Sequence, residues 1–222
     1  TMDKPEIDEI LACSINLHKK EVKLGDGKIY FGCYCKIEVL CRGKEENDIF
    51  LLQDDVYFSK EEEAIGVNGD MIATNQMEIV NSDSIITADD LGENRVINVE
   101  FNVKGTVKVI SKEIIDVIKD AYSPTQSIEL TKKKYDIGIV QGVVPSELII
   151  KDNLYPKNED EKISCVVWTG GCPLITETSI EDDKVKIEGI VKVQVLYKVA
   201  EEECKLDMCS GEIPFTSVID LK

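Results

Sequence analysis

The chain of 222 residues has few of the residues from which active sites are usually built. It contains one histidine, His18, and one tryptophan, and aromatic residues make up 6% of it. It has no Cys-x-x-Cys pair of the kind that holds zinc, no Gly-x-Ser-x-Gly nucleophile elbow and no phosphate-binding glycine loop. We therefore expect no catalytic residues, no metal site and no cofactor, and we interpret His18 as a surface residue.

Positive charge is also scarce. The sequence has 26 Lys and Arg residues against 43 Asp and Glu residues, which gives a formal net charge of −17. Nucleic acid and anionic lipid both require a dense basic surface, so neither is expected as a principal partner. No apolar run approaches the roughly 20 residues of a membrane-spanning helix, and residues 1–6 lack the basic and then apolar order of a signal peptide. We expect neither membrane insertion nor export by the usual secretory route.

What the chain does have is a regular alternation of apolar and polar residues. From 28 to 41, the odd-numbered positions are apolar and most even-numbered positions are polar. This is the two-residue period of a strand with one face in a core. Cys33, Cys35 and Cys41 lie on the apolar stripe, and we interpret them as buried structural cysteines that act as small hydrophobes.

The same pattern returns 156 residues later in the chain. Residues 184–197 align with 28–41 without a gap, and every position keeps its inward or outward parity. After a shift of one residue, Ile213-Pro214-Phe215 aligns with Val56-Tyr57-Phe58. The sequence thus predicts an internal duplication.

Further strands are predicted around these two copies. A long one runs over 96–110, where Gly105 indicates a bulge or bend. Residues 114–118 fit either one or two helical turns or a continuation of the strand, and the run 120–124, which contains Pro124, breaks any helix. Short strands are predicted at 48–52, 76–80, 126–130, 137–143, 148–150, 163–168 and 205–209. Many short strands with Gly, Asn and Asp turns predict an all-β fold of antiparallel β-sandwiches with little helix.

Several of these segments resemble a known family. Residues 26–32, the strand 96–109 followed by Asp120-Ala121-Tyr122-Ser123-Pro124, and the repeated block 184–197 are similar to the SPOCS domain of sporulation proteins from clostridia and their relatives. The resemblance implies a first β-domain at 1–120, a linker or crossover at 121–135 and a second, shorter β-domain at 136–222. No catalytic residues are associated with this domain, so the resemblance implies none.

The resemblance also implies a role in spore formation. Members of the family include coat morphogenetic proteins and cysteine-bearing proteins of the outer spore layers. We therefore expect a structural, self-assembling protein of the spore surface, in a coat layer, an exosporium layer or an appendage. It would be made in the mother-cell cytoplasm and would have further copies of itself, and other spore-coat proteins, as partners. The alternative is a non-enzymatic adaptor that binds a spore-coat scaffold protein.

Two features bear on how such a protein would assemble. The second copy has no counterpart of the strand 96–110, so its sheet is either completed by an earlier part of the chain or left with an open edge, which can pair with another chain. Cys13, Cys172 and Cys209 lie outside the apolar stripe, Cys172 in an expected Gly-Gly-Cys-Pro turn and Cys209 at an outward position. We interpret these three as candidates for disulfide cross-links between neighbouring molecules.

Clusters of Asp and Glu lie at many of the predicted strand ends. None has the spacing of a calcium-binding loop. We interpret them as solvated turns. Their like charges would repel each other and make contacts between neighbouring molecules sensitive to salt.

Overall fold

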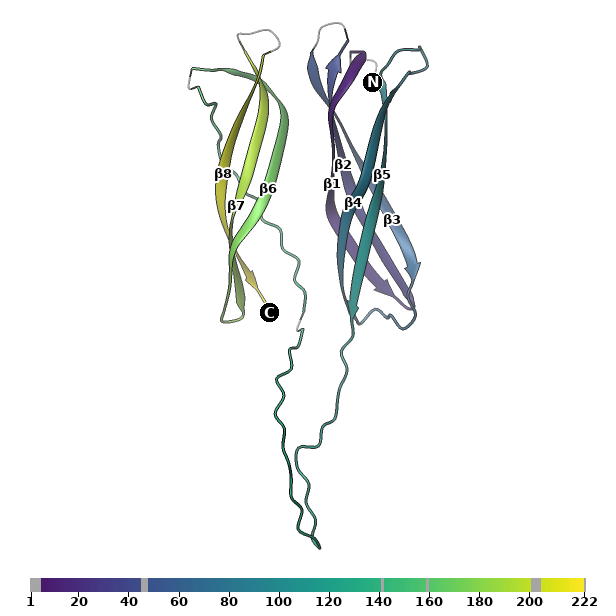
Figure 1. Ribbon diagram of the computed structural model, residues 1–222, viewed down its shortest axis with the longest axis vertical. Helices are drawn as coiled ribbons and strands as arrows, with labels where there is room; N and C mark the ends of the chain where they lie inside the picture. Colours follow the sequence, from purple (N-terminus) through teal and green to yellow (C-terminus); the bar gives the residue numbers. More distant parts are fainter. Residues whose placement is uncertain (1–4, 45–47, 141, 159, 201–204, 222) are drawn as a thin grey trace.

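The computed structural model describes residues 5–44, 48–140, 142–158, 160–200 and 205–221, and these residues form strands without helix. The strands are β1 (Ile7–Gly25), β2 (Lys28–Gly43), β3 (Ile49–Glu63), β4 (Ile72–Thr87), β5 (Val96–Ile110), β6 (Ile163–Glu181), β7 (Lys184–Val199) and β8 (Leu206–Asp220). They make three antiparallel sheets with the orders β1-β2-β3, β4-β5 and β6-β7-β8 (Figure 1). The predicted all-β fold is confirmed. Among the described residues, no helix has the length and apolar character needed to cross a membrane.

The internal duplication extends to the irregularities of the strands. β1 and β6 each have 19 residues, β2 and β7 have 16, and β3 and β8 have 15. β1 and β6 each contain three register shifts against the central strand, and the first two shifts of each strand lie at corresponding positions, at Ile7 and Ile10 in β1 and at Ile163 and Val166 in β6. The sheets β1-β2-β3 and β6-β7-β8 are therefore two copies of one unit.

The first copy forms a sandwich because a hairpin covers its apolar face. The odd-numbered side chains of β2 face β4 and β5, as the alternation over 28–41 predicts. Two core clusters result: Ile7, Val39 and Cys41 pack with Ile86 and Ile97 among others, and Cys33, Cys35 and Met77 pack with Phe101 and Val103 among others. Burial of these apolar side chains, at about 25 cal/mol for each Å² removed from water, holds the two layers together.

Gly105 is not the site of the bulge that the sequence suggested. It pairs in register with Met77, and the register shift of this hairpin lies in β4, between Ile79 and Asn81. A Cβ atom at Gly105 would lie 3.5 Å from the ring of Phe31. This is an ordinary van der Waals distance, so Gly105 packs against the facing sheet without a steric requirement for glycine.

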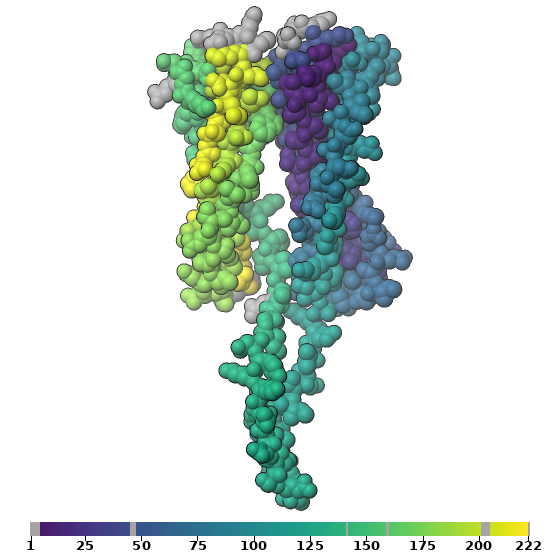
Figure 2. Space-filling view, in the orientation of Figure 1, coloured from purple at the N-terminus to yellow at the C-terminus, as the bar shows by residue number. Residues whose placement is uncertain are grey.

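Residues 111–162, between β5 and β6, contain no described strand. The strands predicted at 126–130, 137–143 and 148–150 are wrong for the residues described there, residue 141 lying outside them, and 114–118 forms neither helix nor strand. Alternating apolar residues are present, but a strand also requires a neighbour that accepts its backbone hydrogen bonds. We call residues 111–150 the arm; Figures 1 and 2 show most of it projecting beyond the ends of the sheets, and Figure 1 shows its last part returning alongside the second sheet.

The two copies meet where β3 lies beside β6, and a polar cavity lies between their sheets. Ser14, Asn16 and Glu38 of the first sheet line one cavity with Lys192 and Gln194 of the second. Since side chains alternate along a strand, the odd-numbered side chains of β7 point away from the first copy. This arrangement determines which face of the second sheet is presented to other molecules.

Candidate functional site

The outward face of the second sheet is apolar and extends over β7 and β8. It corresponds to the face of the first sheet that β4 and β5 cover. In the register of the sheet, Val185 pairs with Ile219, Gly189 with Phe215 and Val191 with Ile213. Its apolar side chains are half-buried instead of buried: Val185, Ile187, Val191, Val193, Val195, Ile213, Phe215 and Ile219. We call these eight residues the open face.

One end of this sheet is covered by the chain that leads into β6. Leu154 packs against a cluster of Tyr197, Val199 and Cys209. A Cβ atom at Gly211 would lie 2.4 Å from Leu154, so the glycine admits this leucine. Leu154 is the residue of the preceding segment that packs on this buried cluster, and the half-buried apolar side chains of the open face continue toward the β6–β7 turn.

A buried phenol strengthens the covered end. Tyr197 is 0% exposed, and its hydroxyl donates a hydrogen bond of 2.7 Å to Glu161. This bond to a carboxylate, together with burial, raises the pKa of Tyr197 above its ordinary value of 10.0. Tyr197 stands at the position of Cys41 in the first copy, and both side chains are fully buried.

The arm also presents apolar side chains to solvent. Ile114 is 97% exposed and Ile137 and Ile139 are each 80% exposed. Tyr135, Ile137 and Ile139 occupy alternate positions, with Asp136 and Gly138 between them. Such a stripe is typical of a strand that packs on an apolar surface, and contiguous exposed apolar surface of this kind marks interaction sites.

The cysteines of the central strand are core residues. Cys33, Cys35 and Cys41 are at most 1% exposed. Burial, and then the neighbouring Cys35, raises the pKa of Cys33 to about 12, and burial raises the pKa of Cys35 as well. Because the thiolate is the nucleophilic form, these two thiols are unsuited to catalysis.

The three candidate cross-linking cysteines lie in different surroundings. Cys172 is exposed, but it lies inside β6 opposite Lys192, so the predicted turn is wrong. Cys13 is half-buried against the core of the first copy, and burial raises its pKa. The outward position predicted for Cys209 is also wrong, since it is 3% exposed and faces the same side as Val195. Lys205 and Asp207 suggested an outward side, but they lie at a strand end where polar residues carry little information on parity.

One exposed thiol was not singled out from the sequence. Cys165 is exposed near the start of β6, although it shares the parity of the buried Val167. A register shift lies on either side of it, between Ile163 and Cys165 and between Val166 and Trp168. The alternation pattern therefore has no predictive value at this position. Cys204 lies outside the described residues.

The titratable groups of the surface form local pairs. His18 contacts Asp55 through Nε2, at 3.0 Å, and both side chains are more than a third exposed. In the part of the chain that the structure describes, no group of three or more His, Cys, Asp or Glu side chains is arranged to hold a metal ion. The His18–Asp55 pair is a surface contact of small energetic weight.

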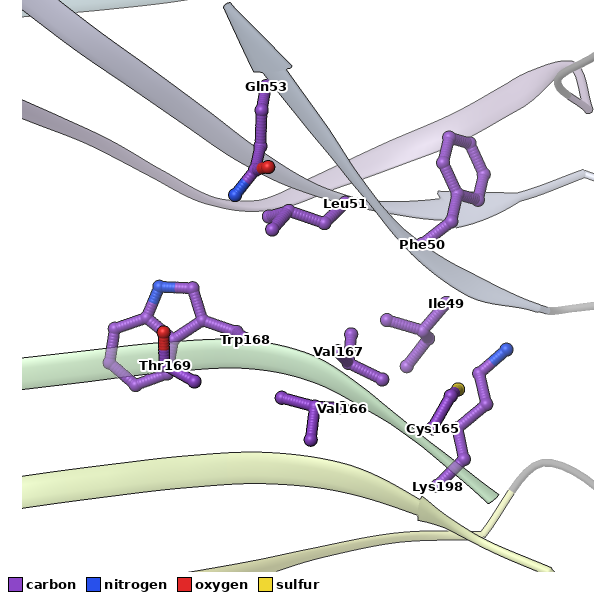
Figure 3. A pocket seen from close by; sticks show the side chains of 10 residues that line it. All are labelled: Ile49, Phe50, Leu51, Gln53, Cys165, Val166, Val167, Trp168, Thr169 and Lys198. Atoms are coloured by element: carbon purple, nitrogen blue, oxygen red, sulfur yellow. The ribbon is translucent and has the colours of Figure 1, made fainter. Parts of the chain in front are cut away.

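A groove of about 440 Å³ lies between β3 and β6. Figure 3 shows Ile49 and Leu51 of β3 pointing toward β6, and Phe50 pointing away from the groove. Lys198 and Cys165 are the ionisable residues among those that line it, and Lys198 pairs with Asp48. The groove is thus a contact region between the two copies, without the converging ionisable groups of an active site.

Comparison with known proteins relates both copies to one family. A family model described as the SipL, SPOCS domain matches residues 6–87 and 162–222, which together make up more than half of the chain. The matched ranges contain the two sheets and leave out β5 and the arm. Comparison with curated proteins gives no match, and comparison with solved structures gives none.

Proposed function

The chain belongs to the SipL SPOCS-domain family, and from this premise we propose that it is a structural, self-assembling protein of the bacterial spore surface. The family gives the sporulation-related role. Beyond this role, we propose that the protein is made in the mother-cell cytoplasm. It would then be deposited in a coat layer, an exosporium layer or an appendage of the spore.

The open face is the observation that carries the proposal. The chain contains one sheet twice, and a hairpin covers the apolar face of the first copy. The same face of the second copy is half-buried and points away from the first copy. Removal of such a surface from water favours association with another protein surface.

The proposal includes the absence of catalytic activity. It is supported by the raised pKa of the buried thiols of Cys33 and Cys35, and by the surface pairing of His18 with Asp55. It also includes disulfides between neighbouring molecules once the surroundings become oxidising. The exposed thiol of Cys172 would take part in them, and because it lines the cavity between the two sheets, the thiol of the neighbour would have to enter this cavity.

Electron microscopy of the purified chain tests self-assembly. We expect ordered polymers in negative stain that become resistant to dilution after oxidation, and a Cys172→Ser variant whose polymers still form but dissociate on dilution. A fluorescent fusion in sporulating cells tests the location, and a ring around the developing spore is the expected result. A stable monomer that is recruited by one coat-scaffold protein would support the adaptor function instead. A diffuse fusion signal together with a monomer would contradict both functions.

A further inference from the structure

We infer that the arm of one molecule covers the open face of a second copy, so that each contact joins two chains head to tail. This inference rests on the proposed self-assembly and names the surfaces that carry it. Each chain has one arm and one open face, which are different surfaces. Contacts between two different surfaces can be repeated from molecule to molecule, and they give a filament when the rotation between neighbours does not close a ring.

The arm has the features of the hairpin that covers the first copy. Its two limbs run toward and away from the tip, and Lys132 on one limb lies 3.8 Å from Asp120 on the other. Its apolar side chains are exposed on both limbs, as Ile114 and Ile139 illustrate. In the first copy, the equivalent surface is covered by two antiparallel strands, β4 and β5. A two-limbed apolar segment is therefore the kind of element that fits this face.

The geometry favours a second molecule as the source of the arm. Within one chain, the segment that precedes β6 places Leu154 on the covered end of the sheet, at Gly211. The arm then leaves the sheet and projects beyond it (Figure 2). Its apolar stripe is thus presented to a neighbouring molecule, while the apolar side chains of the open face beyond Leu154 are half-buried in their own chain.

The charges of the two surfaces are complementary. Lys132, Lys133 and Lys134 directly precede the apolar stripe of the arm. Glu181, Asp182 and Asp183 form the acidic turn that precedes Val185 at the uncovered end of the sheet. About 10 Å of extended chain separates Lys134 from Ile137, at 3.3 Å for each residue. Lysines at the acidic turn therefore leave Ile137 and Ile139 in reach of the open face.

Two variants of the full chain test the two surfaces of the contact separately. Ile137→Asp with Ile139→Asp places charge on the arm, and Val191→Asp places charge on the open face. Sedimentation and light scattering over a concentration series should show that each variant weakens self-association at least about tenfold. The controls are Ile65→Asp, at an exposed turn, and Val218→Asp, at an exposed position on the other face of β8. Each single control matches the change of charge of Val191→Asp, and the two substitutions combined match that of the arm variant. Both controls should assemble as the unchanged chain does.

Mixing the two variants gives the decisive result. The arm variant retains an intact open face, and the face variant retains an intact arm. We expect the mixture to form heterodimers that grow no further, detected by native mass spectrometry. A mixture that stays monomeric, or single variants that assemble like the unchanged chain, would overturn the inference.

Two other outcomes separate this inference from the proposed function. If the unchanged chain assembles and localises to the spore while both variants do the same, the surface function stands and the arm contact fails. If the unchanged chain stays monomeric at every concentration and its arm amides are protected from hydrogen exchange, the arm covers its own sheet, and the inference fails. In that second case, the location of the fluorescent fusion still decides the proposed function.

Discussion

The two copies of the sheet differ in what covers them. Cys35 and Val191 occupy equivalent positions in β2 and β7, yet Cys35 is buried under β4 and β5 while Val191 is half-buried. At the other end, Cys41 and Tyr197 are equivalent and both are fully buried, because a segment of the chain covers each of them. The comparison shows that strand pattern and register can be duplicated without the layer that completes the core.

The largest expected effect comes from charge placed at equivalent positions of the two sheets. Cys35→Asp should lower the free energy of unfolding by more than about 4 kcal/mol, because it leaves a buried carboxylate without a partner. Val191→Asp should cost about 1 kcal/mol, because its side chain can reach water. Urea unfolding followed by far-UV circular dichroism, at concentrations where the chain is monomeric, measures both changes. Equal losses would mean that the open face is covered within the monomer.

A second prediction concerns close packing inside the second sheet. A Cβ atom at Gly189 would lie 2.4 Å from the carbonyl oxygen of Leu174 and 2.6 Å from the ring of Phe215. Gly189→Ala should therefore destabilise this sheet by about 1–3 kcal/mol. The fluorescence of Trp168, the one tryptophan of the chain, reports unfolding of this copy.

Gly171→Ala is the matched control for Gly189→Ala. A Cβ atom there would meet Val191 at 3.7 Å, an ordinary van der Waals distance. The control should change stability by less than about 0.5 kcal/mol. If both alanine variants unfold alike, the close approach at Gly189 has no energetic weight.

As pH rises above neutrality, the first copy of the sheet should lose stability at a lower pH than the second copy. The pKa of Cys33 is raised from 9.0 to about 12, so the unfolded state loses this proton first, and stability falls as pH rises from about 9 toward 12. The pKa of Tyr197 is raised from 10.0 by Glu161 and by burial, so its contribution falls only above pH 10. The free energy of unfolding measured by circular dichroism should therefore begin to fall at a lower pH than the free energy of unfolding measured by Trp168 fluorescence.

Cys33→Ala separates these two contributions to the alkaline decline. The variant should remove part of the decline between pH 9 and 10 and leave the Trp168 signal unchanged. An unchanged decline in circular dichroism would show that Cys33 is not the group responsible.

The smallest effect is expected at the contact between the copies. Lys198 of β7 pairs with Asp48, and both side chains are partly exposed. Lys198→Ala should change the free energy of unfolding by less than about 1 kcal/mol, as is usual for exposed ion pairs. A double-mutant cycle with Asp48→Ala measures the coupling, and a value of several kcal/mol would mean that the two copies form one cooperative unit.

The sequence alone determined the central strand of each three-stranded sheet and the repetition of the two, whereas β1 (Ile7–Gly25) was not predicted. The two-residue alternation over 28–41 and 184–197 placed β2 and β7, and the unchanged parity between them revealed the duplication, because each side-chain position depends on local backbone geometry. The buried positions of Cys33, Cys35 and Cys41 followed from the same alternation. The family resemblance also came from residues that are close in the chain, such as those of 120–124.

Only the tertiary structure decided which apolar residues acquire a partner. Residues 126–130 and 137–143 alternate like strands, but no neighbouring strand accepts their hydrogen bonds, so they remain an exposed arm in the described part of the chain. Cys209 and Cys165 were placed by the register of β8 and by the shifts of β6. The physical reason is that pairing and burial are contacts between distant segments, and a local pattern states what a residue can do without stating what will lie opposite to it.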